Sequence, residues 1–208
     1  NRPLPSKAVS PKYALISSII LFISGSISVL FLSVDAKIIA LFVVLPLIIV
    51  YNIKLKKLPL IGNAIISAIL GLTFLFSGAV FGNMNKMLIP CFLAFGLTFV
   101  REIIKDIEDI AGDQLEGVST FPIIAGLNKA KNLTVILAIL IGFGSLLPYF
   151  SGIYSLWYLI FLILGVEIPL VMLVVLIMKS PSKKTYSFLS KLLKVSIVFG
   201  IFAIYFGS

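Results

Sequence analysis

Seven long apolar segments, separated by short polar stretches, account for most of the chain. Each is about long enough for a helix to cross a hydrocarbon core of roughly 30 Å. We expect the two shortest, the second and the fourth, to extend into their polar flanks. The pattern therefore predicts an all-α, polytopic transmembrane helical bundle with spans near residues 13–34, 38–53, 60–82, 87–100, 133–150, 156–178 and 188–206.

Composition agrees with this prediction and excludes several chemistries. Of the 208 residues, 60% are hydrophobic and only 12% are charged, whereas a soluble domain has roughly twice that charged fraction. The chain has no histidine, which excludes histidine acid–base catalysis and histidine-ligated zinc. The single cysteine, Cys91, lies in an apolar run and has no partner in the chain for a disulfide.

The basic residues predict how the chain is oriented in the membrane. The net charge of +9 is spread over short loops without a nucleic-acid-binding motif, so we predict no nucleic-acid partner. If the N-terminus is cytoplasmic, every Lys and Arg except Lys37 and Lys86 lies on or near the cytoplasmic side. This follows the positive-inside rule and predicts contact with anionic lipid headgroups. The cytoplasmic segments are then residues 1–12, 54–59, 101–131 and 179–194.

The beginning of the chain does not resemble a start of translation. It has no Met and no signal-peptide pattern, and the two prolines of the first five residues favour an extended connection. We therefore expect the chain to be the C-terminal portion of a longer protein. Within the spans, we expect four glycines to let neighbouring helices approach closely: Gly25, Gly71, Gly78 and Gly96.

One short stretch, residues 101–117, holds six of the eight acidic residues in the chain. In a continuous helix Asp106, Asp109 and Asp113 would share one face, with Glu102 a turn earlier. Like charges at such spacings destabilise a helix by about 0.2–0.5 kcal/mol per pair, and a divalent cation would remove that cost. Ligands that are all oxygen fit Mg²⁺. The alternative is a solvated helical extension whose acids need no partner.

Basic residues near this cluster could contact a phosphate. Each could equally be a topology signal, but together with a carboxylate face they predict a site for a diphosphate-bearing substrate. These residues are Arg2, Lys54, Lys56, Lys57, Arg101 and Lys105.

Glu167 lies near the middle of the sixth predicted span, next to Pro169. An ionisable group in a membrane is costly and is a functional candidate. A hydrogen-bonded structural role beside a proline kink is the alternative.

Four stretches carry a family resemblance: NRPLPSK at residues 1–7, residues 51–63 with their Lys-Lys and Gly-Asn pairs, REIIKDIEDIAGD at 101–113, and STFPI at 119–123. The family they resemble is the UbiA-type intramembrane prenyltransferase superfamily. The first stretch is similar to the loop after its first Asp-rich motif, and the second stretch to its second cytosolic loop. The third stretch, followed by the fourth, is similar to its second Asp-rich motif. The resemblance covers essentially the whole chain. The run at 101–113 is closest to the branch that includes digeranylgeranylglyceryl phosphate synthases, the archaeal ether-lipid enzymes and their bacterial relatives.

The resemblance implies nine transmembrane helices around a central cavity, with a cytosolic cap. Residues 1–208 would form a single transmembrane prenyltransferase domain, its C-terminal portion, and residues 101–131 the cytosolic loop or cap with the second Asp-rich motif. Seven spans of the nine are visible. We expect the first two helices and the first Asp-rich motif to be missing, and the fragment alone to be inactive.

The resemblance also implies an activity and its residues. The reaction would be Mg²⁺-dependent transfer of a geranylgeranyl group from geranylgeranyl diphosphate to geranylgeranylglyceryl phosphate, in the cell membrane with the active site facing the cytoplasm. Catalytic and metal-binding roles fall on Asp106, Asp109 and Asp113. Diphosphate or substrate binding falls on Arg2, Tyr51, Lys56, Asn63, Arg101 and Lys105.

Two alternatives remain open at this point. The acceptor could be an aromatic quinone precursor of the hydroxybenzoate, naphthoate or homogentisate type, because one motif seldom fixes a substrate. The chain could also be a small transporter with an acidic regulatory loop. A transporter predicts charged or helix-breaking residues at mid-membrane in several spans, and only the neighbourhood of Glu167 and Pro169 offers them.

Overall fold

The computed structural model describes residues 9–115, 117–179 and 181–208. Every regular element in these ranges is helical, which confirms the predicted all-α class. Seven helices or helix combinations are long and apolar enough to cross a membrane, in agreement with the seven predicted segments. They are Pro11–Val29, Val34–Ile53, Ile61–Val80, Met84–Glu108, Leu127–Phe150, Leu156–Met178 and Lys183–Gly207.

Several spans are built from more than one element. In chain order the elements are α1 (Pro11–Val29), α2 (Val34–Lys37), η1 (Ile38–Val44), α3 (Leu45–Ile53), η2 (Leu55–Lys57), α4 (Ile61–Val80), η3 (Met84–Met87), α5 (Leu88–Glu108), α6 (Ile110–Leu115), α7 (Phe121–Ala125), α8 (Leu127–Phe150), α9 (Leu156–Leu162), η4 (Ile163–Glu167), α10 (Ile168–Met178) and α11 (Lys183–Gly207). The second and fourth spans do extend into their polar flanks, as predicted.

Prolines explain why two spans are irregular. The second span contains a π-helix, η1, which ends two residues before Pro46, and the sixth contains a second, η4, which ends two residues before Pro169. Proline has no N–H to donate, and its ring collides with the carbonyl four residues earlier. A local π-helical turn widens the backbone at that place while the helix continues.

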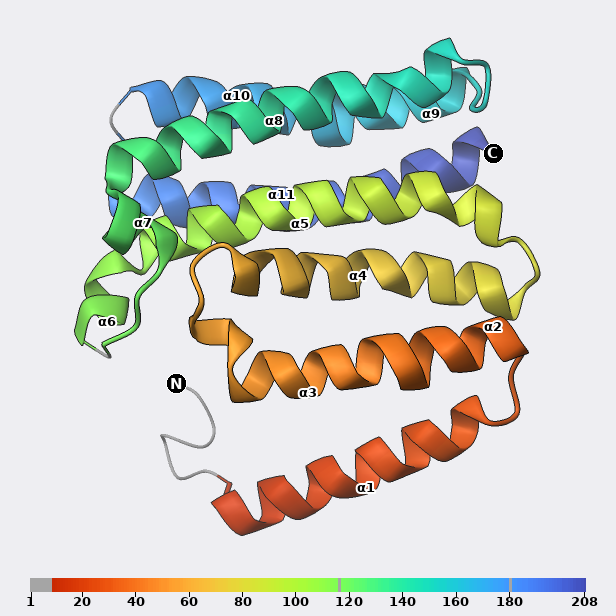
Figure 1. Ribbon diagram of the computed structural model, residues 1–208. Helices are drawn as coiled ribbons and strands as arrows, with labels where there is room; N and C mark the ends of the chain where they lie inside the picture. The colour runs from red at the N-terminus through yellow and green to blue at the C-terminus, as the bar shows by residue number, and fades with distance from the viewer. Residues whose placement is uncertain (1–8, 116, 180) are drawn as a thin grey trace.

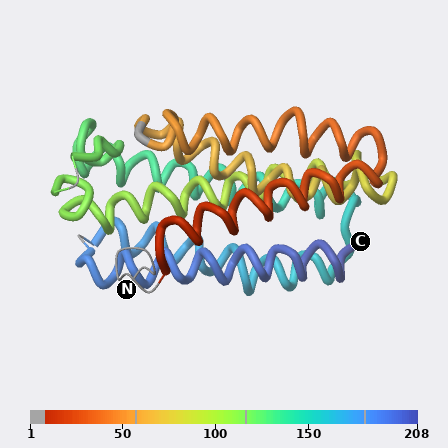
Figure 2. The backbone as a smooth tube through the Cα atoms, turned by 90° about the horizontal axis from the view of Figure 1, so that it is seen from below, coloured from red at the N-terminus to blue at the C-terminus, as the bar shows by residue number. Residues whose placement is uncertain are grey.

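The spans lie side by side, and their connections alternate between two ends of the bundle (Figure 1). One end holds η2, α6, α7 and the connection from α10 to α11, and we call it the site end. The turns after α1, α4 and α8 lie at the opposite end, together with the C-terminus; the view from below agrees (Figure 2). The connections that we predicted to be cytoplasmic, among the described residues, therefore all lie at the site end.

Helix α5 lies at the centre of the packed core, with α4, α8 and α11 against it. Its fully buried side chains include Val100, Ile103 and Ile104. Two of the predicted glycine contacts are found here: a Cβ on Gly71 of α4 would lie 2.7 Å from the Cys91 carbonyl oxygen of α5, and one on Gly96 would lie 2.9 Å from a side-chain carbon of α8. These glycines let the helices that carry the site approach closely.

The other two predicted glycines behave differently. Gly78 packs against the turn that follows its own helix, since a Cβ there would lie 2.7 Å from the Met87 side chain. The prediction for Gly25 is wrong, because nothing lies within 4 Å of its Cβ position. Helix α1, which carries Gly25, has no buried residue, so there is no close neighbour at this position for a small residue to accommodate.

Candidate functional site

The end of α5 separates an apolar face from a polar one. Ile103, Ile104 and Ile107 are buried against the bundle, which holds this last part of the helix in place. Glu102 and Asp106, one turn apart, lie on another side and are only partly exposed. The helix therefore presents carboxylates at the site end while its isoleucines anchor it.

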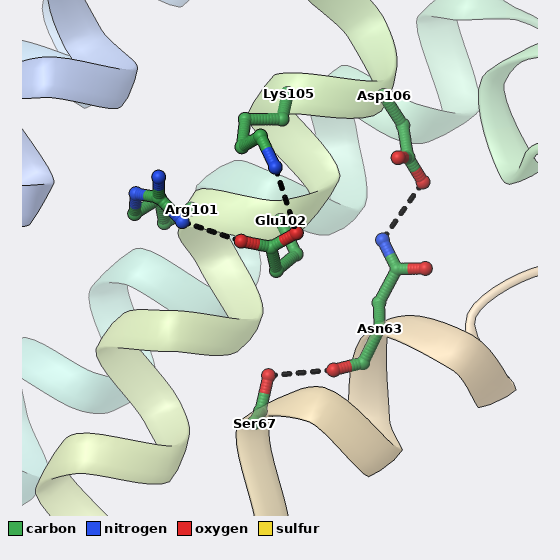
Figure 3. Close-up of polar contacts among 6 residues, drawn as sticks. All are labelled: Asn63, Ser67, Arg101, Glu102, Lys105 and Asp106. Carbon is green, nitrogen blue, oxygen red and sulfur yellow. Dashed lines mark hydrogen bonds and ion pairs between the residues drawn. The ribbon is translucent and has the colours of Figure 1, made fainter. Parts of the chain in front are cut away.

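A hydrogen bond joins the acidic end of α5 to α4. The Asn63 side-chain amide donates to Oδ2 of Asp106 over 2.8 Å (Figure 3). Asn63 lies in the first turn of α4, where Ser67 Oγ donates to its backbone carbonyl over 2.6 Å. The neighbouring Gly62 lets the η2 backbone approach, since a Cβ there would lie 3.1 Å from the Leu55 carbonyl oxygen.

A small polar cavity of about 80 Å³ lies at this junction, and we call it the polar cavity. Four residues that the sequence analysis singled out meet in its wall: Tyr51 of α3, Lys56 of η2, Asn63 of α4 and Asp106 of α5. They come from four different elements and from two separate stretches of the sequence, residues 51–63 and 101–113. Its other lining residues are Leu58, Pro59, Gly62, Ile66, Glu102, Val118, Ser119 and Thr120.

Glu102 forms ion pairs with two of the basic residues that we predicted to bind diphosphate, Arg101 and Lys105. One carboxylate oxygen pairs with Arg101 Nη1, and the other lies 3.2 Å from Lys105 Nζ (Figure 3). Glu102 lines the polar cavity, whereas Arg101 and Lys105 are not among its lining residues. In this structure neither cation lines the cavity itself; the Glu102 carboxylate, with which both pair, belongs to a residue that does.

The prediction that Asp106, Asp109 and Asp113 share one face of a single helix is wrong. Helix α5 ends at Glu108, Asp109 is its C-terminal cap with φ −100° and ψ 7°, and α6 begins at the next residue. Asp109 directly precedes the first turn of α6, a position where a carboxylate interacts favourably with the helix dipole. Asp109 is exposed, while Asp113 is half-buried.

The acidic residues still influence one another through space. The carboxylates of Asp113 and Glu102 lie close enough to Asp106 to repel its charge, and the Lys105 ammonium attracts it. Among the described residues, however, no three acidic or cysteine side chains converge closely enough to hold a metal ion by themselves. The metal-binding role of the three aspartates stays a prediction.

Three further positions complete the comparison with the sequence analysis. Arg2 lies outside the described residues. Glu167 accepts a hydrogen bond from Ser145 Oγ of α8 and does not line the polar cavity, which favours its structural interpretation. Sequence reasoning did not assign roles to Glu102 and Thr120, although both lie in the stretches that carried the resemblance; their place in the wall depends on contacts between helices.

A second cavity lies next to the first along the same helices. It has a volume of about 310 Å³ and an almost wholly apolar lining from α1, η1, α3 and α4. Tyr51 and Ile66 line the polar cavity, while Ile48 and Ile69, each three residues deeper in the same helices, line the apolar one. A polar compartment at the site end is thus followed, about one helical turn deeper, by an apolar compartment.

Comparisons with known proteins show the family and the fold of the chain. The model of the UbiA prenyltransferase family matches residues 1–198. The chain is 38% identical to digeranylgeranylglyceryl phosphate synthase of Methanosphaera stadtmanae, covering all of this chain and 76% of that protein. It is also 38% identical to the synthase of Saccharolobus solfataricus, covering all of this chain and 73% of that one.

A solved structure gives the same result at the level of the fold. It is described as "Structural and mechanistic insights into the biosynthesis of Digeranylgeranylglyceryl phosphate synthase in membranes". It matches all of this chain and 73% of its own with a TM-score of 0.78, at 34% sequence identity. The fold and the order of the helices are therefore shared with a membrane protein of similar sequence.

Proposed function

The chain belongs to the UbiA prenyltransferase family and is a multi-pass membrane prenyltransferase, and we propose that it transfers a geranylgeranyl group from geranylgeranyl diphosphate to geranylgeranylglyceryl phosphate in ether-lipid synthesis. The observation that carries this proposal is the meeting of Tyr51, Lys56, Asn63 and Asp106 in one polar cavity. Family membership also removes the transporter alternative. The choice of acceptor is based on the relatives named above, since each is a digeranylgeranylglyceryl phosphate synthase.

Two adjoining compartments suit a substrate with a charged head and an apolar tail. The exposed Lys56 ammonium on the wall of the polar cavity would attract the diphosphate. The apolar cavity beside it offers apolar contacts for part of an isoprenoid chain and excludes water. The protein would lie in the cell membrane with its site end facing the cytoplasm, because the basic connections lie at that end.

The carboxylates supply the oxygen ligands for a divalent cation, which the family implies. Mg²⁺ commonly takes one or two carboxylates and completes its shell with water and substrate phosphate oxygens. Two carboxylates, those of Asp106 and Asp113, would therefore be enough as protein ligands, and Asp109 would be a further one. When bound, Mg²⁺ would neutralise charge on the diphosphate. Asn63 would hold the Asp106 carboxylate in a fixed orientation through their hydrogen bond.

The proposed reaction exchanges one C–O bond for another. The bond between the prenyl C1 and the diphosphate oxygen breaks, and its electron pair leaves with the diphosphate. The acceptor hydroxyl oxygen then bonds to C1 of the allylic cation and loses its proton to water. Lys56 would stabilise the charge that develops on the departing diphosphate.

The test uses the full-length protein in lipid vesicles with labelled geranylgeranyl diphosphate and Mg²⁺. Geranylgeranylglyceryl phosphate and 4-hydroxybenzoate are offered in separate reactions, and labelled product is measured. We expect product with the glyceryl phosphate acceptor and none without a divalent metal. Product with the aromatic acceptor alone would replace the proposed acceptor by the aromatic class.

A further inference from the structure

The Thr120 hydroxyl is buried and has no hydrogen-bond partner among the described residues. Thr120 occupies the N-cap position of α7, where a threonine side chain ordinarily accepts a hydrogen bond from the first turn. It makes no such bond. Because a buried hydroxyl without a partner is unfavourable, this side chain needs a reason to be there.

The backbone around Thr120 is fixed by other contacts. Its carbonyl oxygen accepts from the Ile123 and Ile124 amides over 3.0 and 3.1 Å. Pro122 is buried, and α7 packs against both α5 and α8. The hydroxyl is therefore held where it is by the packing of α7 and not by any bond of its own.

Thr120 is among the residues that line the polar cavity. Lys56 lines the same cavity from η2, and Glu102 lines it from α5 with its charge already balanced by two cations. A hydroxyl donor beside an ammonium is suited to an anionic oxygen acceptor. The cavity of about 80 Å³ is slightly smaller than the share of three water molecules, each about 30 Å³, so it fits a small polar group and not an isoprenoid chain.

We propose that Thr120 is a substrate-binding residue whose hydroxyl donates a hydrogen bond to a phosphate oxygen in the polar cavity, beside Lys56. The assignment rests on the proposed function, because both proposed substrates bear phosphate. The phosphate belongs either to the prenyl diphosphate or to the glyceryl phosphate acceptor. Either source explains why a buried hydroxyl is left without a protein partner.

The test compares two substitutions with a matched control. Thr120→Val keeps the shape of the side chain and removes the hydroxyl, while Thr120→Ser keeps the hydroxyl. Thr134→Val is the control, since the Thr134 hydroxyl donates to the Ala130 carbonyl in its own helix, α8, and Thr134 lines neither cavity. KM is measured for each substrate separately in vesicles, and binding of inorganic pyrophosphate is measured by calorimetry.

We expect T120V to raise the KM of one substrate about tenfold, as loss of a hydrogen bond to a charged group would. T120S and T134V should stay within about threefold of the parent protein. A raised KM for the prenyl diphosphate, with weaker pyrophosphate binding, assigns the hydroxyl to the donor; a raised KM for the acceptor alone assigns it to the glyceryl phosphate. Unchanged KM values for both substrates would overturn the assignment, whatever happens to kcat.

Two further outcomes keep the proposals separate. If T120V unfolds, Thr120→Ala provides the same comparison, and an unchanged KM in that variant counts against the assignment. If the parent protein transfers no prenyl group to either acceptor class, the proposed function fails. Binding of pyrophosphate and of glycerol phosphate to T120V then still tests Thr120, and binding of both equal to that of the parent protein would overturn its role.

Discussion

Asn63 and Asp106 are 43 positions apart in the sequence, yet the amide of one donates a 2.8 Å hydrogen bond to the carboxylate of the other. This contact connects the first turn of α4 to the end of α5 in the wall of the polar cavity. It fixes one carboxylate oxygen and leaves the other for a ligand. The following predictions begin from this contact.

Replacing Asn63 by Ala should lower kcat/KM about 10–100-fold, because loss of a hydrogen bond that orients a metal ligand has an effect of that size. The Mg²⁺ concentration for half-maximal rate should rise as well. Asn52→Ala is the matched control, since Asn52 is exposed and bonds only to the Ile48 carbonyl in the described structure. Equal rates and equal Mg²⁺ dependence for N63A and the parent protein would contradict the orienting role.

Conversion of Asp106, Asp109 or Asp113 to Asn should each reduce turnover, with about 10²–10³-fold loss for Asp106, a magnitude typical of removing one electrostatic contact to a developing charge. Asp106 should be the most sensitive because it alone of the three lines the cavity. Initial rates across a Mg²⁺ titration measure this. Asp35→Asn, at the opposite end of the bundle, should behave like the parent protein, and full activity in D106N would refute the metal role.

Glu102→Gln should strengthen inhibition by inorganic pyrophosphate by a few fold, with a larger effect at low salt. The substitution removes the charge that now pairs with Arg101 and Lys105, so both cations become available to an anionic ligand. Inhibition constants at two ionic strengths measure the effect, and Glu108→Gln is the control on the same helix. Weaker inhibition in E102Q would show instead that Glu102 holds the cations in their productive positions.

Gly71→Ala should destabilise the protein by about 1–3 kcal/mol, the usual cost of overpacking. Its Cβ would lie 2.7 Å from the Cys91 backbone carbonyl oxygen, so α4 and α5 must move apart. Thermal unfolding in detergent measures the change. Gly144→Ala is the control, because nothing lies within 4 Å of its Cβ position; a similar loss in both variants would exclude the α4–α5 contact as the cause.

Glu167→Gln should leave prenyl transfer unchanged, while Glu167→Ala should lower the free energy of unfolding by about 0.5–1.5 kcal/mol, the net contribution of one hydrogen bond, since Ser145 Oγ can still donate to the Gly142 carbonyl. The reason is that Ser145 Oγ donates to Glu167, and an amide oxygen can still accept that bond. Activity and thermal unfolding are measured on both variants. A loss of turnover in E167Q without a loss of stability would restore the functional interpretation of this residue.

The sequence by itself determined the seven spans and the end of the bundle at which the acidic motif lies (Figure 1). Apolar runs of about twenty residues have few alternatives to membrane-crossing helices, and the motif at residues 101–113 indicated the family. Hydrophobic patterning is a local property, so it survives without knowledge of the packing. Composition alone also removed every chemistry that needs histidine.

Only the tertiary structure decided which side chains meet. That Asn63 binds Asp106 and that the Thr120 hydroxyl is buried without a partner among the described residues both depend on packing between α4, α5 and α7. The pairs of Glu102 with Arg101 and Lys105 are instead local to α5. The break at Asp109 likewise replaced the single acidic face that helical spacing predicted. Contacts between helices depend on how the helices are rotated and how far apart they lie. Close packing at glycines and the burial of isoleucines together set that rotation and separation, and periodicity along one helix does not contain that information.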